Sequence, residues 1–217
     1  VGAIVAGLLA GLVNGFLVAK AKITDFVVTL GMLSAASGLG LILSDGQPVT
    51  VTEGFFFDIS LDGPVSMVSW IVVLAIVAAV VAHVVLFHTR FGTHVLATGG
   101  SPEAATATGI RTDRVKLAVY AIAGLLAGLA AIIVVARLGS TPPAANTTYL
   151  LNSVAAVVLG GVSLFGGKAS ILGPVFGALL LTVLLNGLTT LGVSQYYQPL
   201  SVGVVVVAAA FLMRFQK

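Results

Sequence analysis

Long stretches without any charged residue are the feature that most constrains this chain. They cover residues 1–19, 26–44, 67–87, 117–136 and 169–213, and aliphatic side chains dominate each of them. A helix that crosses the hydrocarbon core of a bilayer needs about 20 apolar residues. The first four stretches have that length, and the fifth is long enough for two crossings. The sequence therefore predicts a chain that crosses a membrane repeatedly.

The composition supports this class and excludes others. Of the 217 residues, 59% are hydrophobic and only 8% are charged, whereas a soluble domain carries about 25% charged residues. Ten basic and seven acidic side chains cannot cover the surface of a soluble globule of this size. An ordinary cytosolic enzyme, a nucleic-acid-binding protein and a disordered chain are therefore excluded. Because the apolar runs are continuous rather than alternating, helices are favoured over the strands of a membrane barrel.

Two interruptions set the number of expected crossings at seven. The polar segment Ser194–Pro199 divides the run 169–213 into two spans. The segment Ser153–Phe165 is apolar but too short for a straight crossing, so we expect a broken or tilted helix there. We predict an all-α fold, a polytopic membrane helix bundle in which residues 1–217 form a single transmembrane domain.

The basic residues give the expected orientation, because cytoplasmic loops of membrane proteins carry an excess of Lys and Arg. We place Lys20 and Lys22 on the cytoplasmic side, together with the loop 88–116, which carries four basic residues. The segment 45–66 contains four acidic residues and no basic residue, so we expect it outside. On this topology the C-terminus is cytoplasmic. Arg137 is the exception, and we interpret it as an interfacial arginine that reaches toward the headgroups.

Several glycines recur at a spacing of four within the expected spans. The pairs are Gly7 with Gly11, Gly124 with Gly128, and Gly173 with Gly177. Small residues at this spacing let two helix backbones approach closely in a membrane. We interpret all three pairs as helix-packing sites.

Two similar segments suggest an inverted repeat. Leu12–Gly15 and Leu184–Gly187 both end in Asn-Gly, and on the expected topology they cross in opposite directions. Their amides, Asn14 and Asn186, are the notable polar groups within the spans. A buried amide is costly unless it is paired, so each either forms an interhelical hydrogen bond, which the residues alone favour, or lines a transport pathway.

The loop 88–116 contains signals for a short helix. Ser101 is a suitable N-cap, Pro102 fits the first helical position, and Glu103 fits the first turn. Gly109 is a suitable C-cap, so the expected helix runs over 102–108. Spacing alone leaves two interpretations open, a docking element for a soluble partner and a solvated amphipathic turn.

Signals for catalysis, a cofactor or a metal are missing from the sequence. The segment Gly166–Ser170 resembles a phosphate loop, but that motif requires Gly at position 162 and Ser or Thr at 169, where Val162 and Ala169 stand. His83, His88 and His94 are not spaced with carboxylates as metal ligands. We therefore expect no enzyme activity, no catalytic residue, no metal and no cofactor in this chain.

The loop 88–116 and the segment Ala155–Lys168 resemble the membrane permease subunits of bacterial ABC sugar importers of the ribose, xylose and arabinose type. The segments Gly46–Pro48, Arg111–Lys116 and Leu185–Ser194 fit the same family in order. The resemblance therefore covers essentially the whole chain, and it extends to the related branched-chain amino-acid permeases. It identifies residues 1–217 as a permease domain.

The resemblance implies about ten spans in two inverted halves, so that this chain holds the last seven and three more precede Val1. It implies a multi-pass protein of the bacterial plasma membrane that works as a homodimer among membrane lipids. The implied partners are an ATP-binding ABC subunit and an extracytoplasmic sugar-binding protein. The loop 88–116 matches the family's coupling segment on the ATPase subunit. The residues carried over in that role are Gly99, Gly100, Glu103, Ala104 and Gly109.

We therefore expect a permease subunit that moves a monosaccharide, such as a pentose, inward, driven by a separate ATPase. The candidate substrate-pathway residues are Asn14, Asn186, Ser163 and Phe165. Branched-chain amino acids, nucleosides and a signalling sugar are alternative cargoes. A gradient-driven secondary transporter and a membrane scaffold without transport are alternatives from other classes. The acids lie in loops, with only Asp25 near a span end, which disfavours ion coupling.

Overall fold

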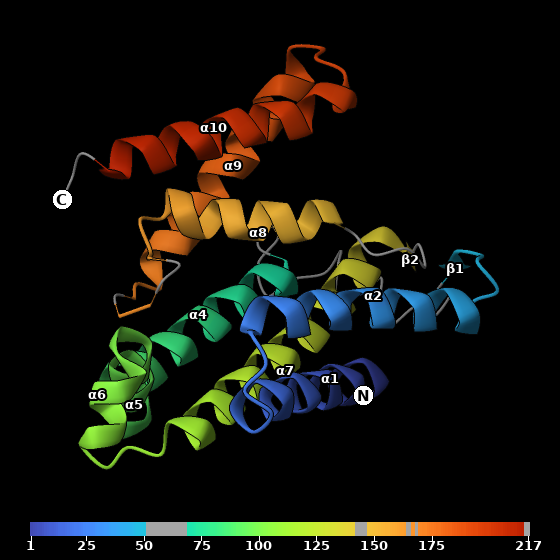
Figure 1. The fold of residues 1–217 in the computed structure, drawn as a ribbon. Coiled ribbons are helices and arrows are strands. Elements are labelled where there is room, and N and C mark those ends of the chain that lie inside the picture. The colour runs from blue at the N-terminus through green and yellow to red at the C-terminus, as the bar shows by residue number, and fades with distance from the viewer. Residues whose placement is uncertain (51–68, 142–146, 164–165, 168, 215–217) are drawn as a thin grey trace. The chain divides into compact units, whose positions relative to one another are not determined.

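The computed structural model describes residues 1–50, 69–141, 147–163, 166–167 and 169–214 (Figure 1). The chain forms two compact units, the first from residues 1–98 and 102–145 and the second from residues 99–101 and 146–217. The helices are α1 (Gly2–Ala19), α2 (Asp25–Leu43), α4 (Trp70–His88), α5 (Arg90–Gly100), α6 (Pro102–Ala107), α7 (Thr112–Leu138), α8 (Thr147–Leu159), α9 (Leu172–Thr190) and α10 (Gln198–Arg214). The first unit also holds strands β1 (Val49–Thr50) and β2 (Ser140–Thr141), which pair antiparallel.

A helix lies at each of the seven places where the sequence predicts a crossing. Among the described residues, five helices, α1, α2, α4, α7 and α9, are long and apolar enough to cross a membrane. The apolar parts of α8 and α10 are shorter. The prediction that the segment 153–165 is too short for a straight crossing is confirmed, because α8 ends at Leu159. The predicted all-α polytopic bundle is confirmed.

The packing of α1 against α7 forms the centre of the first unit. Gly7 and Gly11 lie against Gly124 and Gly128, with no side chain between the two backbones. A Cβ atom added at Gly124 would lie 2.8 Å from the Cα of Gly11 and would overlap the Gly7 carbonyl oxygen. The close helix approach predicted from the glycine spacing is therefore present.

The second unit is built around α8, which packs on α9 and α10. Its core consists of Ala155, Ala156, Leu181 and Val202, none of them more than 7% exposed. Gly177 on α9 lies against the Ala156 carbonyl group, and Gly173 lies against Gly160. The third predicted glycine pair therefore also serves helix packing.

Glycines end two helices of the second unit. After α8, Gly161 has φ +73° and donates its N–H to the Val158 carbonyl, while Val162 N–H reaches Val157. After α9, Gly192 has φ +76° and closes the helix in the same way with Val193. Because this left-handed conformation strains any residue with a Cβ, glycine fixes where each helix stops.

We predict that Gly124→Ala destabilises the protein, because its added methyl group would force α1 and α7 apart. Overpacking of this kind costs about 1–3 kcal/mol. Gly31→Ala on α2 is the matched control, since nothing lies within 4 Å of a Cβ added there. The control should leave the thermal unfolding temperature unchanged or raise it, because Ala favours helix over Gly by about 1 kcal/mol. Equal unfolding temperatures for both variants in detergent would contradict the close packing.

Candidate functional site

A tight corner leads from α4 into the coupling segment, residues 88–116. Thr89 ends α4, and its hydroxyl oxygen accepts the Gly92 N–H at 3.2 Å, which caps the first turn of α5. Gly92 is buried, and a Cβ there would overlap the backbone of Leu86. The corner therefore depends on a threonine that caps and a glycine that allows two helix ends to touch.

Helix α6 begins at Pro102 and ends within one residue of the prediction. Gly109 has φ +87° and donates to the Thr106 carbonyl at 3.0 Å, while Ile110 N–H donates to the Ala105 carbonyl at 3.1 Å. These two hydrogen bonds form the helix stop that the glycine predicts. The hydroxyl groups of Thr106 and Thr112 lie 3.4 Å apart and link α6 to the start of α7.

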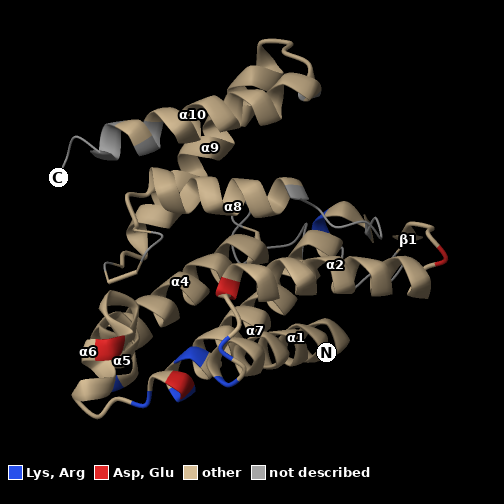
Figure 2. Ribbon diagram, in the orientation of Figure 1, with Lys and Arg blue, Asp and Glu red and all other residues tan. Residues whose placement is uncertain are grey.

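Three of the predicted coupling residues, two on α6 and one just after it, lie on the surface of the first unit. Glu103, Ala104 and Gly109 are exposed, whereas Ala105 between them is 3% exposed and anchors the helix. Figure 2 shows acidic and basic residues on α6, at the start of α7 and in the turn after α1, and others at the opposite ends of α2 and α7, while the body of α1 carries none. The segment therefore presents a polar surface at the ends of apolar helices.

The other two coupling residues lie in the second unit. Gly99 and Gly100 contact the loop after α8, where Gly166 and Gly167 have φ +90° and +79°. A Cβ at Gly166 would overlap the Gly99 carbonyl oxygen, and one at Gly100 would lie 3.7 Å from the Gly167 Cα. We call this backbone contact the glycine latch. It joins the coupling segment to the loop that precedes α9.

Asn14 lies on α1, at the edge of the face that carries Gly11 and Gly15 against α7. Its side chain is partly buried, and its Oδ1 atom is buried with no hydrogen-bond partner among the described residues. A buried acceptor left unpaired costs about 1–3 kcal/mol. No described residue forms an interhelical hydrogen bond to Oδ1, which was one of the two interpretations of this amide.

The remaining pathway candidates belong to the second unit. Asn186 is exposed on α9, four residues before the helix ends, and its backbone carbonyl accepts the Thr190 hydroxyl at 2.9 Å. Ser163 is partly buried in the loop after α8. Phe165, together with Lys168, lies outside the described residues. The structure therefore tests neither a shared pathway nor the inverted repeat.

Two features of this region were not predicted from the sequence. Arg90–Gly100 forms a regular helix, α5, where only a loop was expected. Phe91 and Val95 stand one helical turn apart and gave a signal for it, although the glycine and threonine content argued against a helix. Thr98 was also missed, and its Oγ1 atom is buried without a hydrogen-bond partner among the described residues.

A family model described as "Branched-chain amino acid transport system / permease component" matches residues 1–210. The chain belongs to this permease family. The ribose import permease protein RbsC of Escherichia coli K12 is 41% identical to it over 214 residues. Its Bacillus subtilis counterpart is 39% identical over 202 residues, and the L-arabinose ABC transporter permease protein AraH of Azospirillum brasilense is 35% identical over 216 residues.

The alignments with these three permeases cover 97%, 93% and 100% of this chain, respectively. They cover 66% of the E. coli protein and 63% of each of the other two, so the chain spans somewhat less than two thirds of their length. No solved structure matches the chain significantly. The resemblance to ABC sugar-importer permeases is confirmed at the level of the family.

We predict that Gly166→Ala loosens the glycine latch, whereas Gly161→Ala does not. Both glycines have positive φ, at +90° and +73°, so both substitutions pay a similar backbone strain of about 1–2 kcal/mol. Only at Gly166 does the new methyl group meet another backbone, since nothing lies within 4 Å of a Cβ at Gly161. Hydrogen–deuterium exchange of residues 99–101 should accelerate in Gly166→Ala alone. Unchanged exchange in both variants would contradict the latch.

Proposed function

We propose that this chain is part of the permease subunit of an ABC importer that moves a monosaccharide, of pentose type, into the cell. The supporting observation is the alignment of nearly the whole chain with permeases named for ribose and L-arabinose, at 35–41% identity. Helices of spanning length supply the membrane domain that such a subunit needs. ATP hydrolysis is assigned to a separate subunit, because the one segment similar to a phosphate loop fails the motif at Val162 and Ala169.

A branched-chain amino acid is the competing cargo, because it stands in the description of the family model. Its ammonium and carboxylate groups would require fixed charged partners within the membrane. The charged residues of α1, α2, α4, α7 and α9 are confined to the ends of these helices. This distribution supports a neutral cargo, and it also disfavours a gradient-driven transporter with intramembrane acids.

The coupling segment is the proposed contact with the ATPase subunit. Glu103 and Ala104 on α6 and Gly109 just after it would form the exposed contact, held in place by Ala105 and by the glycine stop. Gly99 and Gly100 would pass movement to the loop before α9 through the glycine latch. Nucleotide-dependent docking would thereby shift the permease between inward-open and outward-open states.

The sugar pathway is proposed to include Asn14, Asn186, Ser163 and Phe165. The Oδ1 of Asn14 supports this role, because it is buried and no described residue donates a hydrogen bond to it. A pathway that opened beside α1 in another state of the permease would let a sugar hydroxyl or water supply that bond. Weak contacts of this kind suit a conduit that leaves selection to an extracytoplasmic binding protein.

The proposed assembly is a homodimer in the bacterial plasma membrane with a cytoplasmic C-terminus. Helix α4 supports an assembly larger than this chain, because none of its residues is buried although it has 19 residues and the highest mean hydropathy of the five long helices. A second permease copy, further spans and lipid are the expected neighbours of such a helix.

We predict that Glu103→Arg lowers coupled transport by about tenfold or more, because reversing a charge at the centre of a contact places like charges together or leaves a partner unpaired. The measurement is sugar uptake and ATP hydrolysis in liposomes that contain the permease, its ATPase and its binding protein. Asp45→Arg is the control, since Asp45 is an exposed acid after α2, outside the coupling segment. Normal coupling in Glu103→Arg would contradict the docking role of α6.

We predict that Asn14→Leu reduces sugar uptake severalfold while leaving thermal stability unchanged or higher. The substitution removes a buried acceptor to which no described residue donates, so folding loses no described hydrogen bond at that atom. Asn152→Leu, at a partly buried position on α8, is the matched control and should retain uptake. If the Asn14→Leu variant has lower thermal stability but its folded fraction takes up sugar at the normal rate, Asn14 is a packing residue and the pathway role is contradicted.

A further inference from the structure

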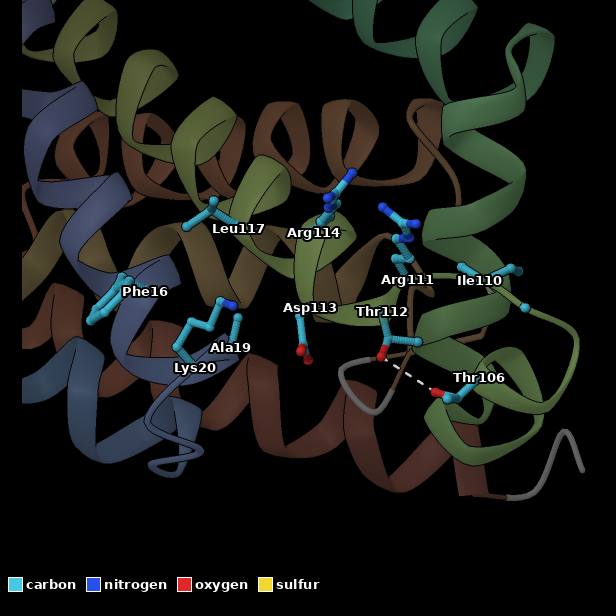
Figure 3. Close-up of a pocket in the computed structure, with 11 residues that line it drawn as sticks. Phe16, Ala19, Lys20, Thr106, Ile110, Arg111, Thr112, Asp113, Arg114 and Leu117 are labelled. Atoms are coloured by element: carbon cyan, nitrogen blue, oxygen red, sulfur yellow. Dashed lines mark hydrogen bonds between the residues drawn. The ribbon is translucent and has the colours of Figure 1, made fainter.

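We propose that the cytoplasmic end of α1 and α7 holds a binding site for a phosphate-bearing anion, supplied by the headgroup of an anionic phospholipid. The site is a cavity of about 540 Å³ in the first unit. Lys20 lies on its rim from the end of α1, and Arg111 and Arg114 lie on it from the start of α7 (Figure 3). Its size falls within the range of about 300–1,000 Å³ that is usual for ligand pockets.

Basic residues outnumber acidic residues around this cavity. Three basic residues line it against a single acid, Asp113. Within the part of the chain that the structure describes, Lys20, Arg111 and Arg114 form no ion pair. Exposed cations of this density at a membrane surface attract anionic lipids, and two arginines supply the planar donors that suit phosphate oxygens.

A neighbouring cavity shows that the surplus is local. It is lined by two basic residues, Lys22 and Lys116, and by three acidic residues, Asp25, Glu103 and Asp113. Acidic residues therefore outnumber basic residues around it. The two cavities share the start of α7, and yet only the first combines several cations with one acid. A general excess of positive charge at this end of the unit therefore does not account for the arrangement.

The depth of the cavity favours a lipid over other anions. Phe16 and Leu117 form its apolar part, and Phe16 is 57% exposed. On α7, Leu117 begins the charge-free stretch and lies about 4.5 Å deeper along the helix axis than Arg114. A phospholipid presents the same order of groups, with a phosphate at the interface and hydrocarbon immediately below it.

The test is lipid binding to the purified permease by native mass spectrometry, with no ATPase or sugar present, so that its failure is separate from failure of the transport proposal. Phosphatidylglycerol is compared with phosphatidylcholine of the same acyl chains. We expect at least a tenfold preference for phosphatidylglycerol. Lys20→Gln, Arg111→Gln and Arg114→Gln should each lower it about fivefold, since each cation near an anionic membrane surface contributes about that factor.

Lys116→Gln is the matched control, because it removes the same charge from the same helix end but lines the other cavity. It should change the preference less than twofold. Arg114→Lys and Arg111→Lys should keep most of the preference for phosphatidylglycerol, because they retain the positive charge. This result would show that the Gln variants lose binding through loss of charge and not through misfolding. If glycerol 3-phosphate or inorganic phosphate binds the cavity with the same affinity as phosphatidylglycerol, the cavity is an anion site. Its ligand is then a soluble phosphate compound rather than a lipid.

Three results would overturn the proposal. The first is equal binding of the two lipids together with no phosphate binding. The second is an equal loss in Lys116→Gln and in the three cavity variants. The third is an unchanged preference for phosphatidylglycerol in all three cavity variants.

Discussion

Backbone contact through glycine is the interaction on which the described structure depends. Helices in a membrane gain little from burying apolar surface, because lipid tails are equally apolar, so close van der Waals contact must hold them together. Gly7 and Gly11 provide that contact against α7 in the first unit, and Gly160 and Gly177 provide it between α8 and α9 in the second. The first contact also determines where function can lie, since it sets Asn14 at the edge of the α1–α7 face and brings the basic ends of both helices around one cavity.

The coupling segment applies the same principle outside the apolar helices. Local capping defines it, with Thr89 and Gly92 at its entry and the Gly109 stop after α6. The glycine latch then places the backbone of Gly99 directly on that of Gly166. A latch without side chains has no rotamers that could absorb a displacement. A displacement of Gly99 and Gly100 would therefore reach the loop before α9 with little loss in side-chain motion, which is the property that the proposed ATPase contact requires.

The sequence was sufficient to predict the seven apolar helices and the stop of α6 at Gly109, because charge-free runs and glycine caps are local signals. The spacing of Gly124 and Gly128 predicted a close contact, but it carried no information that Gly7 and Gly11 lie opposite. Helix α5 was missed because its glycines and threonines favour a loop, and packing of buried Gly92 and Thr98 overrides that preference. The unpaired Oδ1 of Asn14 was also beyond prediction, since it depends on which groups surround the amide in three dimensions.

The central proposal is that the permease to which this chain contributes conducts a neutral sugar under the control of a separate ATPase. The most direct measurement is uptake of labelled pentoses and of leucine into liposomes that contain the complete permease, its ATPase and its binding protein, with either ATP or an ion gradient supplied. The account predicts uptake of a pentose that requires both ATP and the binding protein, with no uptake of leucine. Uptake driven by the gradient without ATP, or transport of leucine in place of sugar, would contradict it.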